Sequence, residues 1–124
     1  MSILRLTLNA WRSLGSNMSA GLPVGKSVLP VYVKIIPTLT ASSVKDQIGI
    51  IHARTKEYIT IDAWPFSYDL VDPIDSTPNE WGYQVEIISK AGEKVVINLT
   101  SEVLSNIPLE NTIRRVRLED YMVL

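Results

Sequence analysis

The chain has 124 residues, of which 46% are hydrophobic and 20% are charged, so it can bury one core and is too short for two. Its formal net charge of −1 excludes a general electrostatic attraction to nucleic acid or to an anionic membrane. It has no cysteine, which excludes disulfides and thiolate metal sites. We therefore expect a single domain, residues 1–124, with neither nucleic acid nor membrane among its partners.

The first part of the chain predicts one strand and one long loop. Leu4, Leu6 and Leu8 alternate with polar residues within residues 3–8, which is the period of a half-buried strand. Residues 12–27 are rich in glycine and serine, contain a proline and show no periodicity. They predict a long surface loop.

The middle of the chain predicts further strands. Residues 28–37 alternate and end in Pro37, which suits the end of a strand better than its centre. Residues 38–46 are polar and rich in turn-forming residues. Two short apolar runs, 48–53 and 57–61, are separated by a brief polar link and predict a tight hairpin or one bulged strand.

The next region predicts a strand and a hairpin. Residues 66–71 alternate, and a proline-containing polar loop follows at 72–79. Residues 83–88 and 95–99 then alternate on either side of a turn at 90–93, which predicts an antiparallel hairpin.

The last region predicts one helical turn and one strand. Ser101 can cap a turn at 101–106, which Pro108 stops, and residues 112–118 alternate again. Short strands at regular spacing are typical of an all-β fold. We predict an antiparallel β-sandwich, or a barrel-like sandwich, of about seven to eight strands with at most one short helical turn.

The sequence predicts no enzyme. His52 is the one histidine, and it lies among apolar neighbours, where a structural neutral ring is more common than a catalytic base. The chain has none of the short motifs that mark a nucleophile, a phosphate loop or a zinc site. We therefore predict no catalytic residue, no bound metal and no cofactor.

Three aspartates recur at every third position. Asp69, Asp72 and Asp75 offer the oxygen ligands that calcium prefers. Pro73 interrupts the series and no glycine provides a sharp liganding turn, so we predict carboxylates that solvate a loop.

Three arginines cluster in the last predicted strand. Arg114, Arg115 and Arg117 can contact phosphate, or they can protect a solvated edge strand against mispairing. Arg115 and Arg117 share one face of the strand, and Arg114 points to the other.

The three tryptophans are candidates for stacking a sugar or a base. Trp11, Trp64 and Trp81 lie at predicted strand ends and in loops. Packing in the core or at its rim is the more common role for such residues. We predict that Trp81 plugs the end of the sandwich and that Gly82 gives the backbone room beside it.

Apolar residues at two places predict an assembly interface. Apolar side chains in a flexible loop or in a tail bury nothing in a free monomer, so they make sense against a neighbouring subunit. The alternative is that each segment folds back onto its own core. The predicted interface residues are Leu14, Met18, Leu22, Val24, Tyr121, Met122, Val123 and Leu124.

Several features follow one another between residues 28 and 124. They are a strand that ends in a proline (31–37), a strand that ends near an aspartate (66–72), Trp81-Gly82-Tyr83 before a hairpin, an Ile107-Pro108 pair and a final Leu118-Glu119-Asp120. This order resembles a small β-sandwich module of the virion proteins of tailed bacteriophages, found in tail fibres, tail spikes, neck and baseplate components. The sequence differs from such modules at Ala63-Trp64-Pro65, where they usually have a glycine turn.

The resemblance implies a structural or assembly protein of a bacteriophage virion, in the tail, the neck or the fibre attachment. It implies other virion subunits as partners, a homo-oligomer, and a location in the virion after synthesis in the host cytoplasm. The alternative is a stand-alone β-sandwich that binds a carbohydrate or a peptide.

Overall fold

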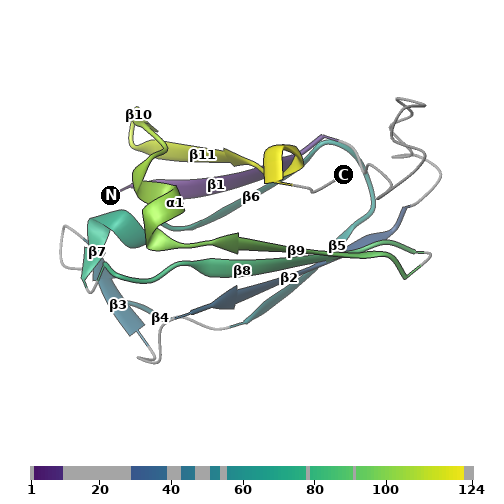
Figure 1. Ribbon diagram of the computed structural model, residues 1–124, viewed down its shortest axis with the longest axis horizontal. Coiled ribbons are helices and arrows are strands. Elements are labelled where there is room, and N and C mark those ends of the chain that lie inside the picture. The colour runs from purple at the N-terminus through teal and green to yellow at the C-terminus, as the bar shows by residue number, and fades with distance from the viewer. Residues whose placement is uncertain are drawn as a thin grey trace.

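The computed structural model describes residues 2–9, 29–38, 43–46, 51–53, 56–77, 79–90 and 92–121. Within these residues, two four-stranded sheets face each other, and a small third sheet lies at one end of the sandwich (Figure 1). The predicted all-β sandwich is confirmed. The described residues form more strands than expected, because short strands occur where the sequence predicted loops.

The first sheet joins strands from both parts of the chain. Its order is β10-β11-β1-β6, and its strands are β10 (Leu109–Glu110), β11 (Ile113–Arg117), β1 (Ile3–Leu8) and β6 (Phe66–Val71). β1 is antiparallel to β6 and parallel to β11. The parallel pair departs from the purely antiparallel expectation.

The second sheet is antiparallel throughout. Its order is β5-β2-β8-β9, and its strands are β5 (Glu57–Ile61), β2 (Val31–Pro37), β8 (Tyr83–Ile88) and β9 (Lys94–Leu99). The predicted hairpin is confirmed as β8 and β9. Its turn is closed by Ser89 N–H donating to Glu93 O at 2.8 Å, and Gly92 supplies the positive φ of 90° that the turn requires.

The prediction that residues 48–53 and 57–61 form a tight hairpin or one bulged strand is wrong. β4 (Ile51–Ala53) pairs with β3 (Ser43–Asp46) in the third sheet, and β5 pairs with β2 in the second. β3 also pairs with β7 (Ser76–Thr77), which follows the 3₁₀ helix η2 (Pro73–Asp75). Periodicity identifies a strand but not its partner, which depends on contacts far along the chain.

The core lies between the inner faces of the two large sheets. Alternate side chains of each strand point inward and interdigitate, as in other β-sandwiches. Each fully buried leucine, isoleucine or valine contributes about 1.5–3 kcal/mol relative to an exposed one. The side chains with essentially no exposed surface include Leu4, Leu6, Leu8, Val31, Ile35, Ile87, Leu99, Leu104 and Leu118.

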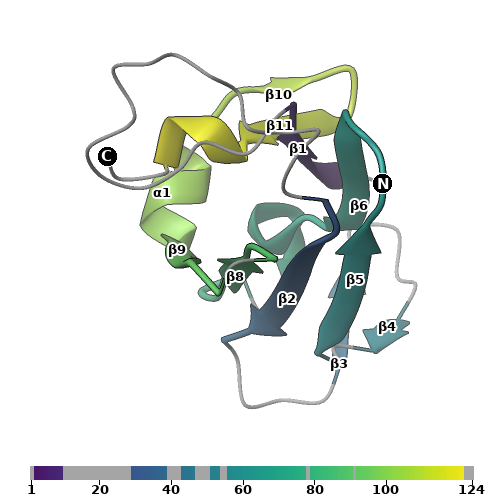
Figure 2. The same cartoon turned by 90° about the vertical axis from the view of Figure 1, so that its right-hand side faces the viewer.

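The two open sides of the sandwich are covered differently. β5 and β6 are consecutive strands, and the chain between them closes one side (Figure 2). The opposite side is covered by the helix α1 (Ser101–Ser105) and the 3₁₀ helix η3 (Leu118–Tyr121). The cap of α1 is Thr100, one residue earlier than predicted, because its Oγ1 accepts the N–H of Val103 at 3.2 Å.

Candidate functional site

A buried ion pair joins the first sheet to the end of the sandwich. Asp72 is 1% exposed and Arg114 is 6% exposed. Arg114 Nε donates to both carboxylate oxygens of Asp72, at 3.0 and 3.2 Å, and Arg114 Nη1 donates to the carbonyls of Leu104 and Ile107. The pair therefore links β11, η2 and α1 through hydrogen bonds that satisfy both charges.

This pair corrects two predictions. Asp72 does not solvate a loop, and Arg114 does not lie on a solvated strand face, because both side chains point inward. The signal in the sequence was the parity of Arg114, which it shares with the buried Val116 and Leu118. An arginine on a core face requires a carboxylate partner, and Asp72 before a proline also fits the cap of a short helix, where its Oδ1 accepts Ile74 N–H.

The other two aspartates have partners of their own. Asp69 accepts from Arg5 at 2.7 Å on the outer face of the first sheet, and Asp75 accepts from Ser2 Oγ at 2.5 Å. The three carboxylates are thus directed to three different places. Across the described ranges, no group of three or more histidine, cysteine or acidic side chains is arranged to hold a metal ion.

Trp81 lies in the core at the end of the sandwich next to β7. It is 2% exposed, its Nε1 donates to Ser76 Oγ at 3.0 Å, and its ring packs edge-on against Tyr83 with centroids 5.0 Å apart. An indole in this position has no free ring face on which a ligand can stack. Gly82 is required beside it, because a Cβ there would lie 1.9 Å from the carbonyl oxygen of Leu99.

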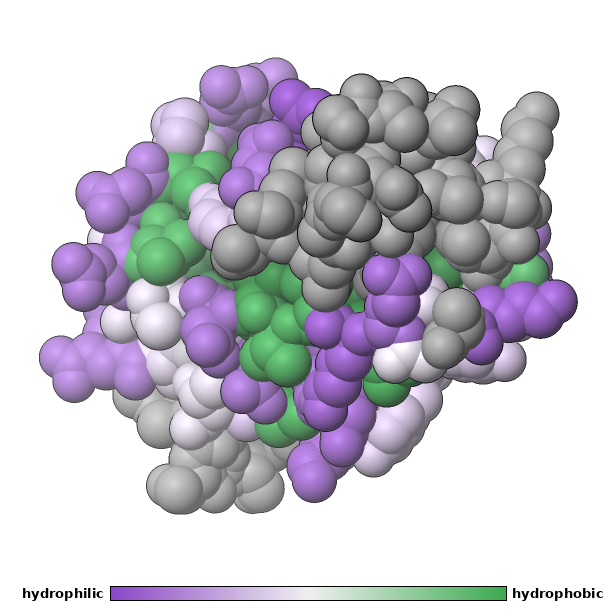
Figure 3. Space-filling view, turned by 45° about the vertical axis from the view of Figure 1, so that its right-hand side comes forward, coloured by the Kyte–Doolittle hydropathy of each residue, from purple (hydrophilic) through white to green (hydrophobic). Residues whose placement is uncertain are grey.

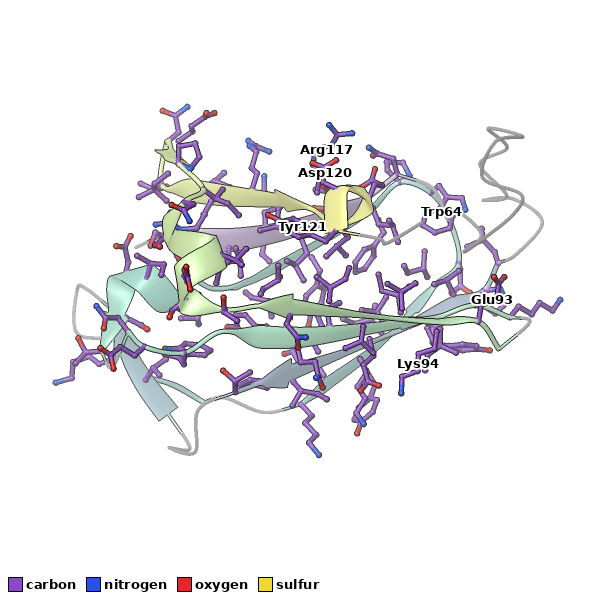
Figure 4. All side chains as sticks on the ribbon, in the orientation of Figure 1. Trp64, Glu93, Lys94, Arg117, Asp120 and Tyr121 are labelled. Carbon is purple, nitrogen blue, oxygen red and sulfur yellow. The ribbon has the colours of Figure 1, made fainter. Side chains whose placement is uncertain are left out.

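The tryptophans do not form one platform in the described part of the chain. Trp64 is partly buried against the core at the end of the sandwich far from β7 (Figure 4). Trp81 lies at the other end, where its indole N–H donates a hydrogen bond to Ser76 on β7. Trp11 lies outside the described residues. His52 pairs with Val44 in the third sheet, and its side chain also lies outside what the structure describes.

The outer face of the second sheet carries exposed aromatic and aliphatic side chains, and we call it the tyrosine face. Tyr58 is 72% exposed, Tyr32 is 45% exposed and Val96 is 44% exposed. The strand register places Tyr58, Lys34, Glu86 and Val96 in one row across all four strands. The next row consists of Thr60, Tyr32, Ile88 and Lys94.

Charged groups hold the centre of the tyrosine face in place. Glu86 lies between two lysines, with its carboxylate 2.5 Å from Lys94 Nζ and 3.8 Å from Lys34 Nζ. The hydrogen bond from Lys94 holds the pKa of Glu86 below its ordinary value. Lys34 Nζ also lies 5.8 Å from the centre of the Tyr58 ring. The two rows together contain two lysines and one glutamate, so their net charge is positive.

A groove of about 430 Å³ runs along the last residues of β11, and we call it the β11 groove. Arg117 and Asp120 point outward above the first sheet (Figure 4), and Tyr121 packs against the core. Tyr121 is the one predicted interface residue that the structure describes; the other seven lie outside the described residues. The lining of the groove includes Thr7, Ile107, Arg115, Arg117, Asp120 and Tyr121.

The molecule leaves apolar surface exposed between hydrophilic side chains, as the space-filling view shows (Figure 3).

Comparison with known proteins gives no match: no family model, no curated protein and no solved structure matches this chain. Among the described residues, no helix has the length and apolar character to cross a membrane. The fold and the side chains described above are therefore the basis for the function.

Proposed function

We propose that the chain is a structural subunit that acts through protein–protein contacts and that the tyrosine face is one of its contact surfaces. The observation that carries the proposal is the row of Tyr58, Lys34, Glu86 and Val96 across four strands, with Tyr32 in the adjacent row. Tyrosine supplies a large contact area at low entropic cost and is enriched in interfaces.

The organisation of the face supports this role. The hydrogen-bonded strands of the second sheet hold these side chains in fixed positions, so that little order is lost on binding. The ion pairs around Glu86 fix the charged centre, and the tyrosines and Val96 surround it. Because the face is net positive, a second copy docked on it would bring lysines together, whereas an acidic partner surface would complement it.

The order of strands, prolines and aromatic residues between residues 28 and 124 extends the proposal. It resembles virion modules of tailed bacteriophages, so we place the subunit in such a virion, with other virion subunits as partners. The homo-oligomer stays a prediction, since most of its predicted interface residues lie outside the described residues. A carbohydrate module has less support, because Trp81 is buried. The role proposed involves no reaction.

The test is assembly in the host that makes the protein. A Tyr32→Ser/Tyr58→Ser variant should fold normally and fail to sediment with the particle or complex that contains the wild-type protein. Leu109→Ser is the matched control, since Leu109 is 42% exposed but lies on β10 of the other sheet. Normal assembly of the double tyrosine variant would overturn the proposal.

A further inference from the structure

The open edge of β11 lies in the β11 groove. β10 pairs with only two residues of β11, with Leu109 opposite Arg114 and Glu110 opposite Ile113. β10 begins directly after Pro108, which has no N–H to donate to a ladder. β11 continues to Arg117 beyond the residues that β10 covers. The last part of β11 is therefore a sheet edge.

The hydrogen-bonding groups on this edge can be assigned from the register. Ile3 N–H donates to Thr112 O at 2.8 Å, so Thr112 and each second residue after it direct their backbone groups toward β1. Arg115 and Arg117 lie between these positions. Their N–H and C=O groups consequently face away from β1, toward the side where β10 has ended.

The side chains along this edge have a definite pattern. Arg115 and Arg117 are exposed, and neither forms an ion pair with another residue of the described ranges. Ile107 and Tyr121 line the groove and pack partly against the core. A strand laid along the edge would thus meet the two arginines on the outer face of the sheet, with the carboxylate of Asp120 near them, and apolar groups beneath it. Two arginines against one carboxylate leave the outer side of the groove net positive.

We propose that the β11 groove binds an extended segment of a partner protein, which adds to the first sheet as a further strand and carries an acidic–apolar–acidic sequence. Its main-chain groups pair with those of Arg115 and Arg117, as in other cases of strand addition. The two acidic side chains, two residues apart, lie on the outer face opposite the two arginines. The residue between them points inward, toward Ile107 and Tyr121. This site is separate from the tyrosine face.

The two arginines have another explanation, which is to protect the edge from pairing with any strand. The two explanations differ in what an acidic strand does. If the arginines only repel, they disfavour basic or neutral strands and the edge still forms no defined complex with an acidic one. If they recognise, an acidic strand binds in one register through both its charge and its backbone.

The test uses synthetic peptides and the full chain, with binding measured by fluorescence anisotropy. The probe is a peptide of alternating glutamate and valine, compared with the same peptide N-methylated at alternate residues on its bonding edge. We expect saturable binding of the first peptide, and binding at least about tenfold weaker for the methylated one, since it retains the charge but loses main-chain hydrogen bonds.

Matched variants locate the site. Arg115→Glu/Arg117→Glu should abolish binding, and Arg117→Pro should weaken it, since proline removes an N–H on the open side of the strand. Tyr58→Ser should bind as the wild type does, which separates this site from the tyrosine face. No binding of the unmethylated peptide, equal binding of both peptides, or equal binding by the Arg115→Glu/Arg117→Glu variant would each overturn the proposal.

Discussion

The end of the sandwich near β7 and the tyrosine face use similar side chains in opposite environments. At the end, the Arg114–Asp72 pair has side chains that are 7% and 0% exposed. On the face, the Lys94–Glu86 pair has side chains that are 52% and 12% exposed. Trp81 is buried at the end, whereas Tyr58 projects from the face. The comparison indicates that the end stabilises the fold and that the face is available for contact.

The largest expected effect is at the buried pair. Arg114→Ala leaves Asp72 as a buried carboxylate without its partner, so we expect it to lower the free energy of unfolding by roughly 3–5 kcal/mol. Urea denaturation measures this change. Arg5→Ala is the matched control, because it removes an arginine that pairs with Asp69 on the exposed outer face. If Arg5→Ala lowered the free energy of unfolding as much as Arg114→Ala does, the buried pair would not be the more stabilising of the two, and the comparison would fail.

A smaller effect is expected at the core tryptophan. Trp81→Phe removes the hydrogen bond to Ser76 Oγ and part of the packed ring area. Ser76 Oγ still donates to Pro73 O at 2.8 Å, so the buried hydroxyl keeps a hydrogen bond in the variant. We expect a loss of about 1–3 kcal/mol by the same measurement. An unchanged free energy of unfolding, together with lost binding of a glycan, would favour the carbohydrate-binding alternative.

A substitution on the tyrosine face should leave stability nearly unchanged and should weaken association with the partner. Tyr58→Ala removes a mostly exposed side chain, so the free energy of unfolding should change by no more than about 0.5 kcal/mol. Association with the partner should weaken, because exposed tyrosines of this kind contribute strongly to interfaces. Stability and association are measured on the same preparation. If the Tyr58→Ala protein were destabilised and still associated with the partner, Tyr58 would have a role in stability and not in contact, which contradicts the comparison.

A tyrosine inside the sandwich gives the smallest and most local test. Tyr68 on β6 is hydrogen-bonded to Glu57 on β5, which together with burial raises the pKa of Tyr68 from 10.0 to about 12. The raised pKa means that the folded state holds the proton more tightly than the unfolded state does. Its contribution to stability is therefore fully present below pH 10 and is lost as the pH rises through 12.

Ultraviolet absorbance of the phenolate measures this titration directly. The wild type should show phenolate absorbance from Tyr68 near pH 12, and Tyr68→Phe should lose that part of the absorbance change. Tyr58→Phe is the control and should retain it. An absorbance change near pH 12 that is as large in Tyr68→Phe as in the wild type would show that Tyr68 is not the residue responsible.

The sequence predicted the strands better than it predicted their partners. Alternation located β1, β6 and the β8–β9 hairpin, since one face of each is buried and the period is local. The segments of β4 and β5 were predicted to form one hairpin or one bulged strand, although they belong to different sheets. The parallel pairing of β1 with β11 joins segments far apart in the chain, which no local pattern encodes.

The candidate surfaces were predictable only in part. Burial of Trp81 and the room given by Gly82 were expected from the sequence, and the structure places both residues accordingly. The tyrosine face was missed, because Tyr58 joins Tyr32 and Lys34 only through the pairing of β5 with β2. Asp72 was also misjudged, since the charge that compensates it comes from a strand far along the chain.

The most direct test of the central claim is photo-cross-linking from position 58 in the host that makes the protein. A photoreactive amino acid replaces Tyr58 in one variant and Leu109 in another, and mass spectrometry identifies the cross-linked product. We predict one discrete partner protein from position 58 and none from position 109. The product should disappear when Val96→Asp is introduced in the same row of the face. No discrete product from position 58, or the same product from both positions, would contradict the account.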